Sequence, residues 1–169
     1  MSMRCGSALA GLTAATLALA TACADMGGDQ HIPVEVLYSG SHCGGDGTEP
    51  HLRRIADEEQ FRTERDAMFR HMLGNDHSDR LQAPDFDENI AVLIAMGQRS
   101  TGGYRLELRD DRAAVDNGAV ELPVTWTEPD EDAMVTQAIT SPCLMVTLPR
   151  QDYDTISAVD QDGETRARE

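Results

Sequence analysis

Hydrophobic and polar positions alternate along two stretches in the second half of the chain. Residues 104–108 and 120–126 place an apolar side chain at every second position, which is typical of strands with one face in water. Asn117-Gly118 separates 113–116 from 120–126 and predicts a type I′ hairpin turn, because both residues tolerate positive φ. The unbroken apolar run 90–96 predicts a central strand that is buried on both faces.

Shorter stretches predict further strands, and a proline limits where one strand can lie. The pattern indicates strands at 34–38, 135–139, 143–148 and 153–159, separated by loops that contain Gly, Pro or acidic residues. Pro123 has no backbone N–H to donate. The strand that contains it is therefore expected to lie at an edge of the sheet or to carry a bulge.

One helix is predicted between Asp57 and Gly74. Asp57 is a good N-cap, Gln60 completes a capping box three residues later, and Gly74 is a candidate C-cap. Four apolar side chains share one face of this helix and are expected to pack on the core: Phe61, Met68, Phe69 and Met72. The expected fold class is α+β, mainly an antiparallel β-sheet with one packed α-helix, in a single domain.

Composition supports one acidic domain and excludes a nucleic-acid partner. The chain has 169 residues, 40% hydrophobic and 26% charged, which is enough for one core and too few for two. Its 14 basic residues are all Arg and stand against 30 acidic residues, giving a formal net charge of -16. Binding to nucleic acid phosphates would require a basic patch, so we expect no nucleic-acid binding.

The N-terminal segment predicts export and a lipid anchor. Residues 8–20 are long enough for the apolar part of a signal peptide and too short to cross a bilayer, so 1–22 are interpreted as a signal peptide. Leu19-Ala20-Thr21-Ala22-Cys23 resembles the lipobox of bacterial lipoproteins, which implies cleavage before Cys23 and lipid attachment to it. The alternative is an ordinary signal peptide whose removal leaves Cys23 free. Residues 23–32 are expected to be the lipidated Cys and a flexible tether.

This anchor places the protein in the bacterial cell envelope, and the remaining cysteines fit that compartment. The expected location is the outer membrane, facing the periplasm or the exterior. Cys43 and Cys143 remain after export and lipidation, and in an oxidising compartment they can form a disulfide that closes a loop of about 100 residues. Two unpaired thiols are the alternative. The folded domain is expected at 33–160, followed by a frayed tail at 161–169.

Three segments resemble the PrcB-like protease-complex-stability domain. They are the hydrophobic strand at 89–97, the turn Ser100-Thr101-Gly102-Gly103-Tyr104, and the Ser-Pro, strand, Pro segment at 140–149. The start of the predicted helix, 55–61, is also similar, so the resemblance extends over 34–159. It implies a non-catalytic envelope lipoprotein that binds and stabilises a protein partner, in the type case an extracellular protease complex.

The turn itself contains the candidate contact residues. Adjacent Gly102 and Gly103 permit positive φ and a close approach by another chain, and Tyr104 adds a rigid ring with a hydroxyl. Thr101 belongs to the same turn, and Arg99 beside it can pair with a carboxylate of a partner. The structural alternative is that the glycines close a hairpin while Tyr104 packs on the core.

An enzyme remains the competing hypothesis, and it would use the loop 39–51. Five residues in this loop could hold Zn²⁺ or supply a thiol nucleophile with a base: His42, Cys43, Asp46, Glu49 and His51. Their spacing is not that of a structural zinc site, and no third group that would orient a catalytic base is recognisable. We therefore predict no catalytic residue, metal ligand or cofactor. The alternatives are a small metal-binding or hydrolytic envelope enzyme and a structural envelope protein without a specific client.

Overall fold

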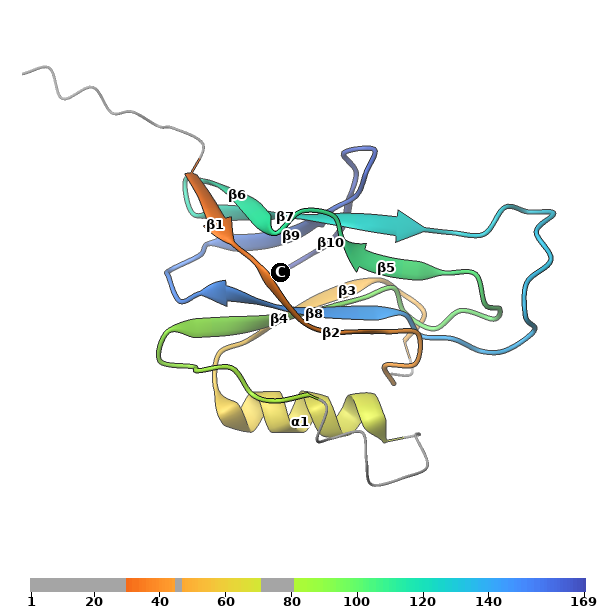
Figure 1. Cartoon of the computed structure of the whole chain (residues 1–169), viewed down its shortest axis with the longest axis horizontal. Helices are drawn as coiled ribbons and strands as arrows, with labels where there is room; N and C mark the ends of the chain where they lie inside the picture. Colours follow the sequence, from red (N-terminus) through yellow and green to blue (C-terminus); the bar gives the residue numbers. More distant parts are fainter. Residues whose placement is uncertain (1–29, 45–46, 71–80) are drawn as a thin grey trace, which may run out of the picture.

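The chain forms two β-sheets and one helix (Figure 1). The computed structural model describes residues 30–44, 47–70 and 81–169. In chain order the elements are β1 (Gln30–Pro33), β2 (Glu35–Gly40), β3 (His51–Ile55), α1 (Glu58–Phe69), β4 (Asn89–Ala95), β5 (Arg105–Leu108), β6 (Arg112–Asp116), β7 (Ala119–Thr127), β8 (Cys143–Pro149), β9 (Thr155–Val159) and β10 (Thr165–Arg168). No helix in these described ranges is long and apolar enough to span a bilayer.

The strands divide into a four-stranded and a six-stranded sheet. The four-stranded sheet has the order β2-β8-β4-β3 and is antiparallel throughout. The six-stranded sheet has the order β1-β6-β7-β9-β10, with β5 also paired to β7, and its β7–β9 pair is parallel. Helix α1 lies on the outer side of the four-stranded sheet (Figure 1). The α+β expectation therefore holds broadly, but the single sheet that we expected is two facing sheets.

Strand β4 is central and buried on both faces, as its apolar run predicted. Ile90, Val92 and Ile94 belong to the core between the two sheets. Ala91 and Leu93 belong to a second core between the four-stranded sheet and α1. Since successive side chains of a strand point to opposite faces, one strand supplies both cores.

Helix α1 begins where its capping residues predicted. The Asp57 carboxylate accepts a hydrogen bond from the Gln60 backbone N–H (2.8 Å), and the Gln60 side-chain oxygen accepts one from the Ala56 N–H (3.0 Å). Phe61 and Met68 are buried against the four-stranded sheet. The predicted positions of Met72 and Gly74 lie outside the described residues.

The predicted hairpin is confirmed, but the expectation for Pro123 is wrong. Asn117 (φ 47) and Gly118 (φ 80) form the turn between β6 and β7 with positive φ at both positions. Strand β7 is an interior strand, flanked by β9 on one side and by β6 and then β5 on the other. Pro123 lies where β6 gives way to β5, and its carbonyl accepts a hydrogen bond from the Arg109 N–H (3.0 Å). The missing N–H therefore interrupts no strand pairing.

Three further expectations need correction. Residues 135–139 form no strand, because no neighbouring strand pairs with them, and Ile139 is 64% exposed. Strand β3 (His51–Ile55) was not predicted; it pairs with β4 through five residues of mixed polarity. The expected tether 23–32 ends in β1, which pairs with β6 from Gln30 onward; residues 23–29 and the signal segment lie outside the described residues.

The expected frayed tail is also wrong. Strand β10 (Thr165–Arg168) pairs antiparallel with β9, and Ala167 is buried in the core between the sheets. The last residue, Glu169, exchanges backbone hydrogen bonds with Ile156. The chain end is held because it completes an edge of the six-stranded sheet.

Candidate functional site

The predicted contact turn lies between β4 and β5 and is joined to the segment that precedes β8. Arg99 and Thr140 exchange backbone hydrogen bonds of 2.8 and 2.9 Å. The Thr140 hydroxyl also donates to the Thr101 carbonyl (2.8 Å). The contact turn and the segment before β8, which both belong to the PrcB-like sequence pattern, therefore lie side by side.

The two glycines of the turn make close contacts within the chain. The Gly102 N–H donates to the Thr136 carbonyl (2.8 Å). Gly103 has φ +91, and a Cβ placed there would lie 2.9 Å from Pro129 Cβ and Val135 Cγ1. A side chain at this position would displace one of these residues or the turn itself. The glycines close no hairpin, because β4 and β5 belong to different sheets. Their contacts with the segment before β8 explain why glycine is needed, and the role of the turn as a partner contact stays a prediction.

Tyr104 and Arg99 support each other at the end of the turn. Tyr104 is half-buried against the core between the sheets. The Arg99 guanidinium carbon lies 5.5 Å from the centre of the Tyr104 ring, and Arg99 Nη1 donates to the Thr48 carbonyl (3.3 Å). Arg99 therefore links the turn to the loop that precedes β3 and to the segment that precedes β8. Both side chains keep a partly exposed surface that a partner can contact.

A hollow of about 510 Å³ opens beside this turn. Gly102, Gly103 and Tyr104 line it together with the first residues of β5. The other lining residues come from the end of β2, the two residues after it and the segment before β8: Ser39, Gly40, Ser41, His42, Thr136, Ala138, Thr140 and Pro142. The lining combines polar and apolar surface in similar proportion, and most of its side chains are small. Protein surfaces have a comparable mixture of polar and apolar groups, so such a hollow can accommodate a polypeptide.

The segment between β7 and β8 is the most exposed part of this region. Residues 127–139 are exposed at almost every position, and the segment projects beyond the ends of the sheets (Figure 1). The side chain of Met134 is fully exposed (102%) and that of Ile139 is 64% exposed. Residues 135–139 were expected to form a strand, and this surface was not expected from the sequence. The sequence does contain a signal for this exposed surface, because apolar residues directly follow the acidic run 128–132.

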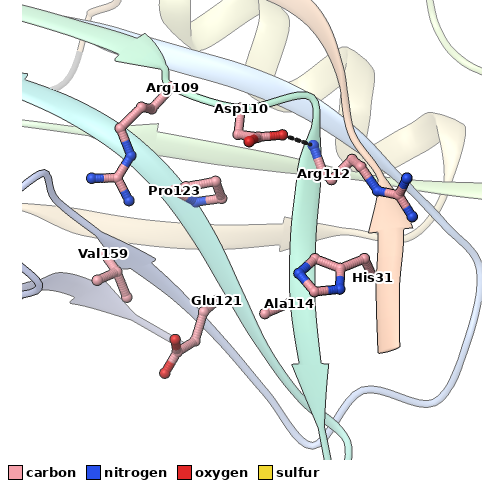
Figure 2. A pocket seen from close by; sticks show the side chains of 8 residues that line it. All are labelled: His31, Arg109, Asp110, Arg112, Ala114, Glu121, Pro123 and Val159. Atoms are coloured by element: carbon pink, nitrogen blue, oxygen red, sulfur yellow. Dashed lines mark hydrogen bonds between the residues drawn. The ribbon is translucent and has the colours of Figure 1, made fainter. Parts of the chain in front are cut away.

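A second hollow of about 510 Å³ lies on the outer face of the six-stranded sheet (Figure 2). Arg109 and Arg112 lie on opposite sides of it, and Asp110 and Glu121 bring negative charge to the same hollow. The Asp110 carboxylate accepts a hydrogen bond from the Arg112 N–H (3.0 Å), and Arg109 Nη1 donates to the Asp160 carbonyl (3.2 Å). Two Arg and two acidic side chains line the hollow, so their charges offset one another and no single ligand charge is favoured.

The loop that the enzyme hypothesis requires contains a disulfide. Cys43 and Cys143 are bonded, with Cα atoms 5.9 Å apart, so the predicted bridge is present and Cys43 has no thiol to act as a nucleophile. His42 contacts its neighbour Ser41 through Nδ1 (3.2 Å). Asp46 lies outside the described residues. In the part of the chain that the structure describes, no three His, Cys, Asp or Glu side chains gather closely enough to hold a metal ion.

One buried carboxylate, Asp160, was not singled out from the sequence, and the structure gives it a structural role. Its side chain is fully buried. Its Oδ1 accepts from the N–H groups of Asp162 and Glu164 (both 2.9 Å), and its Oδ2 accepts from Arg166 Nε (2.6 Å). Burial by itself raises the pKa of Asp160, but the Glu164 N–H, the Arg166 guanidinium and the Asp162 N–H outweigh it and hold the pKa below its ordinary value. Arg166 in turn lies 5.7 Å from the Trp126 ring centre, so this group fastens the β9–β10 turn to β7.

Tyr153 has a pKa that burial raises above its usual value. Its hydroxyl donates to the Pro149 carbonyl (2.7 Å), which satisfies the only polar atom of a ring that packs in the core between the sheets. This arrangement supports the connection from β8 to β9 and exposes no reactive group.

Comparison with known proteins identifies the region that contains the turn and the exposed segment. Residues 90–149 match the family model described as PrcB C-terminal. Neither a curated protein nor a solved structure matches the chain. The matched residues run from β4 through β8 and so include the turn and the exposed segment 127–139, together with all residues lining the hollow except those at 39–42. The predicted resemblance is therefore confirmed for residues 90–149, its extension to 34–89 and 150–159 stays a prediction, and over residues 90–149 the chain matches the PrcB C-terminal family.

Proposed function

We propose that this chain is a non-catalytic lipoprotein of the bacterial cell envelope that binds and stabilises a protein partner, namely a protease complex. The observation that carries this proposal is the overlap between the PrcB C-terminal match and the exposed end of the molecule. That end presents Tyr104, Arg99 and the hollow beside them without burying them under another element of the described chain. Such a surface suits binding to another protein surface.

The mechanism is thermodynamic linkage and needs no chemical step. A partner that is bound only in its folded state gains stability as RT ln(1 + [L]/Kd), which is about 2.7 kcal/mol when the free binder is at 100 times Kd. A lipid on Cys23 would hold the domain at the outer membrane, facing the periplasm or the exterior. The anchor raises the concentration of the binder near an envelope partner. A protease complex would then stay folded longer because this domain is beside it.

The test is capture of the partner by purified variants from detergent-solubilised envelope, with identification by mass spectrometry. Tyr104→Ala and Arg99→Ala should each lower the captured amount several-fold, since both remove surface beside the hollow. Arg168→Ala, on β10 at the far edge of the six-stranded sheet, is the matched control and should leave capture unchanged. The captured protein should also unfold at a lower temperature when the domain is withheld. Capture that does not depend on Tyr104 or Arg99 would contradict this surface.

A further inference from the structure

The backbone on both sides of Met134 forms hydrogen bonds, and on the C-terminal side they reach the contact turn. On the N-terminal side, the Ala133 N–H donates to the Asp130 carbonyl (3.0 Å) and closes a tight turn. On the C-terminal side, Val135 packs over Gly103, and the Thr136 carbonyl accepts from the Gly102 N–H (2.8 Å). We call residues 129–136 the Met134 ridge. Its conformation is set by the rest of the domain before any partner arrives.

The side chain at the top of this ridge has no contact with the core. Met134 is 102% exposed, whereas Val135 beside it is half-buried. Covering this side chain with another surface would be favourable, because it removes apolar surface from water. Because the ridge is already ordered, binding loses little conformational entropy there. The flexible thioether of Met also adapts to pockets of different shape.

The charges around the ridge indicate which residues would surround a partner pocket that binds Met134. Asp130, Glu131 and Asp132 are exposed, and none of them forms an ion pair in the described part of the chain. Glu128, just before the ridge, accepts a hydrogen bond from Trp126 Nε1 (2.9 Å) and is also exposed. An apolar pocket with Lys and Arg at its rim would complement both the methionine and these carboxylates.

We propose that the Met134 ridge docks into an apolar pocket, rimmed by Lys and Arg, on the partner protein. This inference rests on the proposed function and specifies the chemistry of the partner. A second copy of this chain is disfavoured as the occupant, because two copies that each have a formal net charge of -16 repel each other. The family match places the ridge inside the matched segment 90–149, together with the turn that supports it.

The first experiment is site-specific photocrosslinking in intact cells. The photoreactive amino acid p-benzoylphenylalanine replaces Met134 in one strain, Tyr104 in a second and Glu121, on the outer face of the six-stranded sheet, in a third. The Met134 probe should give one crosslinked protein, and sequencing of the crosslinked peptide should place the contact in an apolar pocket bordered by Lys or Arg. The Glu121 probe should not crosslink to that protein.

The other outcomes separate this inference from the proposed function. Crosslinks from the Tyr104 position without any from Met134 would refute docking through the Met134 ridge but would still agree with the proposed function. Crosslinks from Met134 only to another copy of this chain, or to a pocket without basic residues, would likewise overturn the inference. No protein crosslink from either position would overturn both.

The second experiment measures affinity for the protein that the crosslink identifies. Met134→Asp should weaken binding about ten- to a hundredfold, the range expected for the loss of one buried Met side chain, while Met134→Leu should stay within a few-fold of the native chain. Val36→Asp is the matched control, because Val36 is another exposed apolar side chain (51%) but lies on β2. Asp130→Asn with Asp132→Asn should slow association and reduce its dependence on salt. Equal affinities of Met134→Asp and Val36→Asp for the partner would refute docking through the Met134 ridge.

Discussion

Replacing Gly103 by Ala adds one methyl group and tests how closely the Met134 ridge packs on the turn. The φ of Gly103 is +91, and a Cβ there would lie 2.9 Å from Pro129 Cβ and from Val135 Cγ1. The left-handed backbone at this position should therefore make Gly103→Ala about 1–2 kcal/mol less stable than the native chain. Overpacking against the ridge adds about 1–3 kcal/mol. We expect the free energy of unfolding to fall by about 2–5 kcal/mol in total.

Gly163 provides a matched control for this substitution. It also has positive φ (+83), but no atom lies within 4 Å of an added Cβ. Gly163→Ala should therefore lower the free energy of unfolding by the backbone contribution alone, about 1–2 kcal/mol. Urea unfolding followed by the fluorescence of Trp126, the single Trp, gives both values if the slope m is unchanged. Equal losses for the two variants would refute the packing of Pro129 and Val135 on Gly103.

The same pair of variants separates the two interpretations of the glycines. If Gly102 and Gly103 serve only the approach of a partner, Gly103→Ala should lose partner capture and be no less stable than Gly163→Ala. If they seat the ridge, Gly103→Ala should lose more stability, and limited proteolysis should cut the segment 127–139 faster than in the native chain. The contacts of the described chain favour the second result.

Three further predictions test other parts of the molecule. Replacing Cys43 and Cys143 together by Ala should lower the free energy of unfolding by about 4–5 kcal/mol, the chain-entropy value for a sequence separation of 100; a loss under about 1 kcal/mol in urea unfolding would contradict that value. Asp160 has a lowered pKa in the folded state, so its charge stabilises the fold above the unfolded-state pKa of about 3.9, and this contribution is lost as the pH falls through the folded-state pKa. Asp160→Asn should thus be less stable at neutral pH and lose less stability than the native chain below about pH 4, and parallel curves of urea midpoint against pH would contradict this assignment. Cys23→Ala should move the protein from the membrane fraction to the soluble fraction, and retention on the membrane would exclude the lipid as the anchor.

Local signals in the sequence predicted the elements whose causes are local. The helix start follows from Asp57 and Gln60, and the hairpin follows from Asn117-Gly118; each depends on residues within a few positions. The run 90–96 predicted a strand buried on both faces, because a strand with one face in water would have polar residues at alternate positions. These features needed no knowledge of distant parts of the chain.

The remaining features depend on partners far away in the sequence. Strand β3 exists because β4 offers it an edge, although its own residues have no clear alternation. The segment 135–139 has apolar residues at strand spacing but no edge to pair with, so it stays a loop. The ordered C-terminus combines a local ion pair between Asp160 and Arg166 with a distant contact, because Arg166 lies over the Trp126 ring on β7.

The candidate site shows how the two interpretations of the turn can both hold. The sequence singled out Gly102 and Gly103 as positions of close approach, and the structure gives the nearest approach to the chain's own segment 129–136. That segment then presents Met134, whose exposure has no internal explanation. The glycines would thus contribute to binding indirectly, by fixing the residue that makes contact. Gly103→Ala and Met134→Asp should therefore weaken partner binding non-additively, because removing the support already removes much of what the methionine contributes.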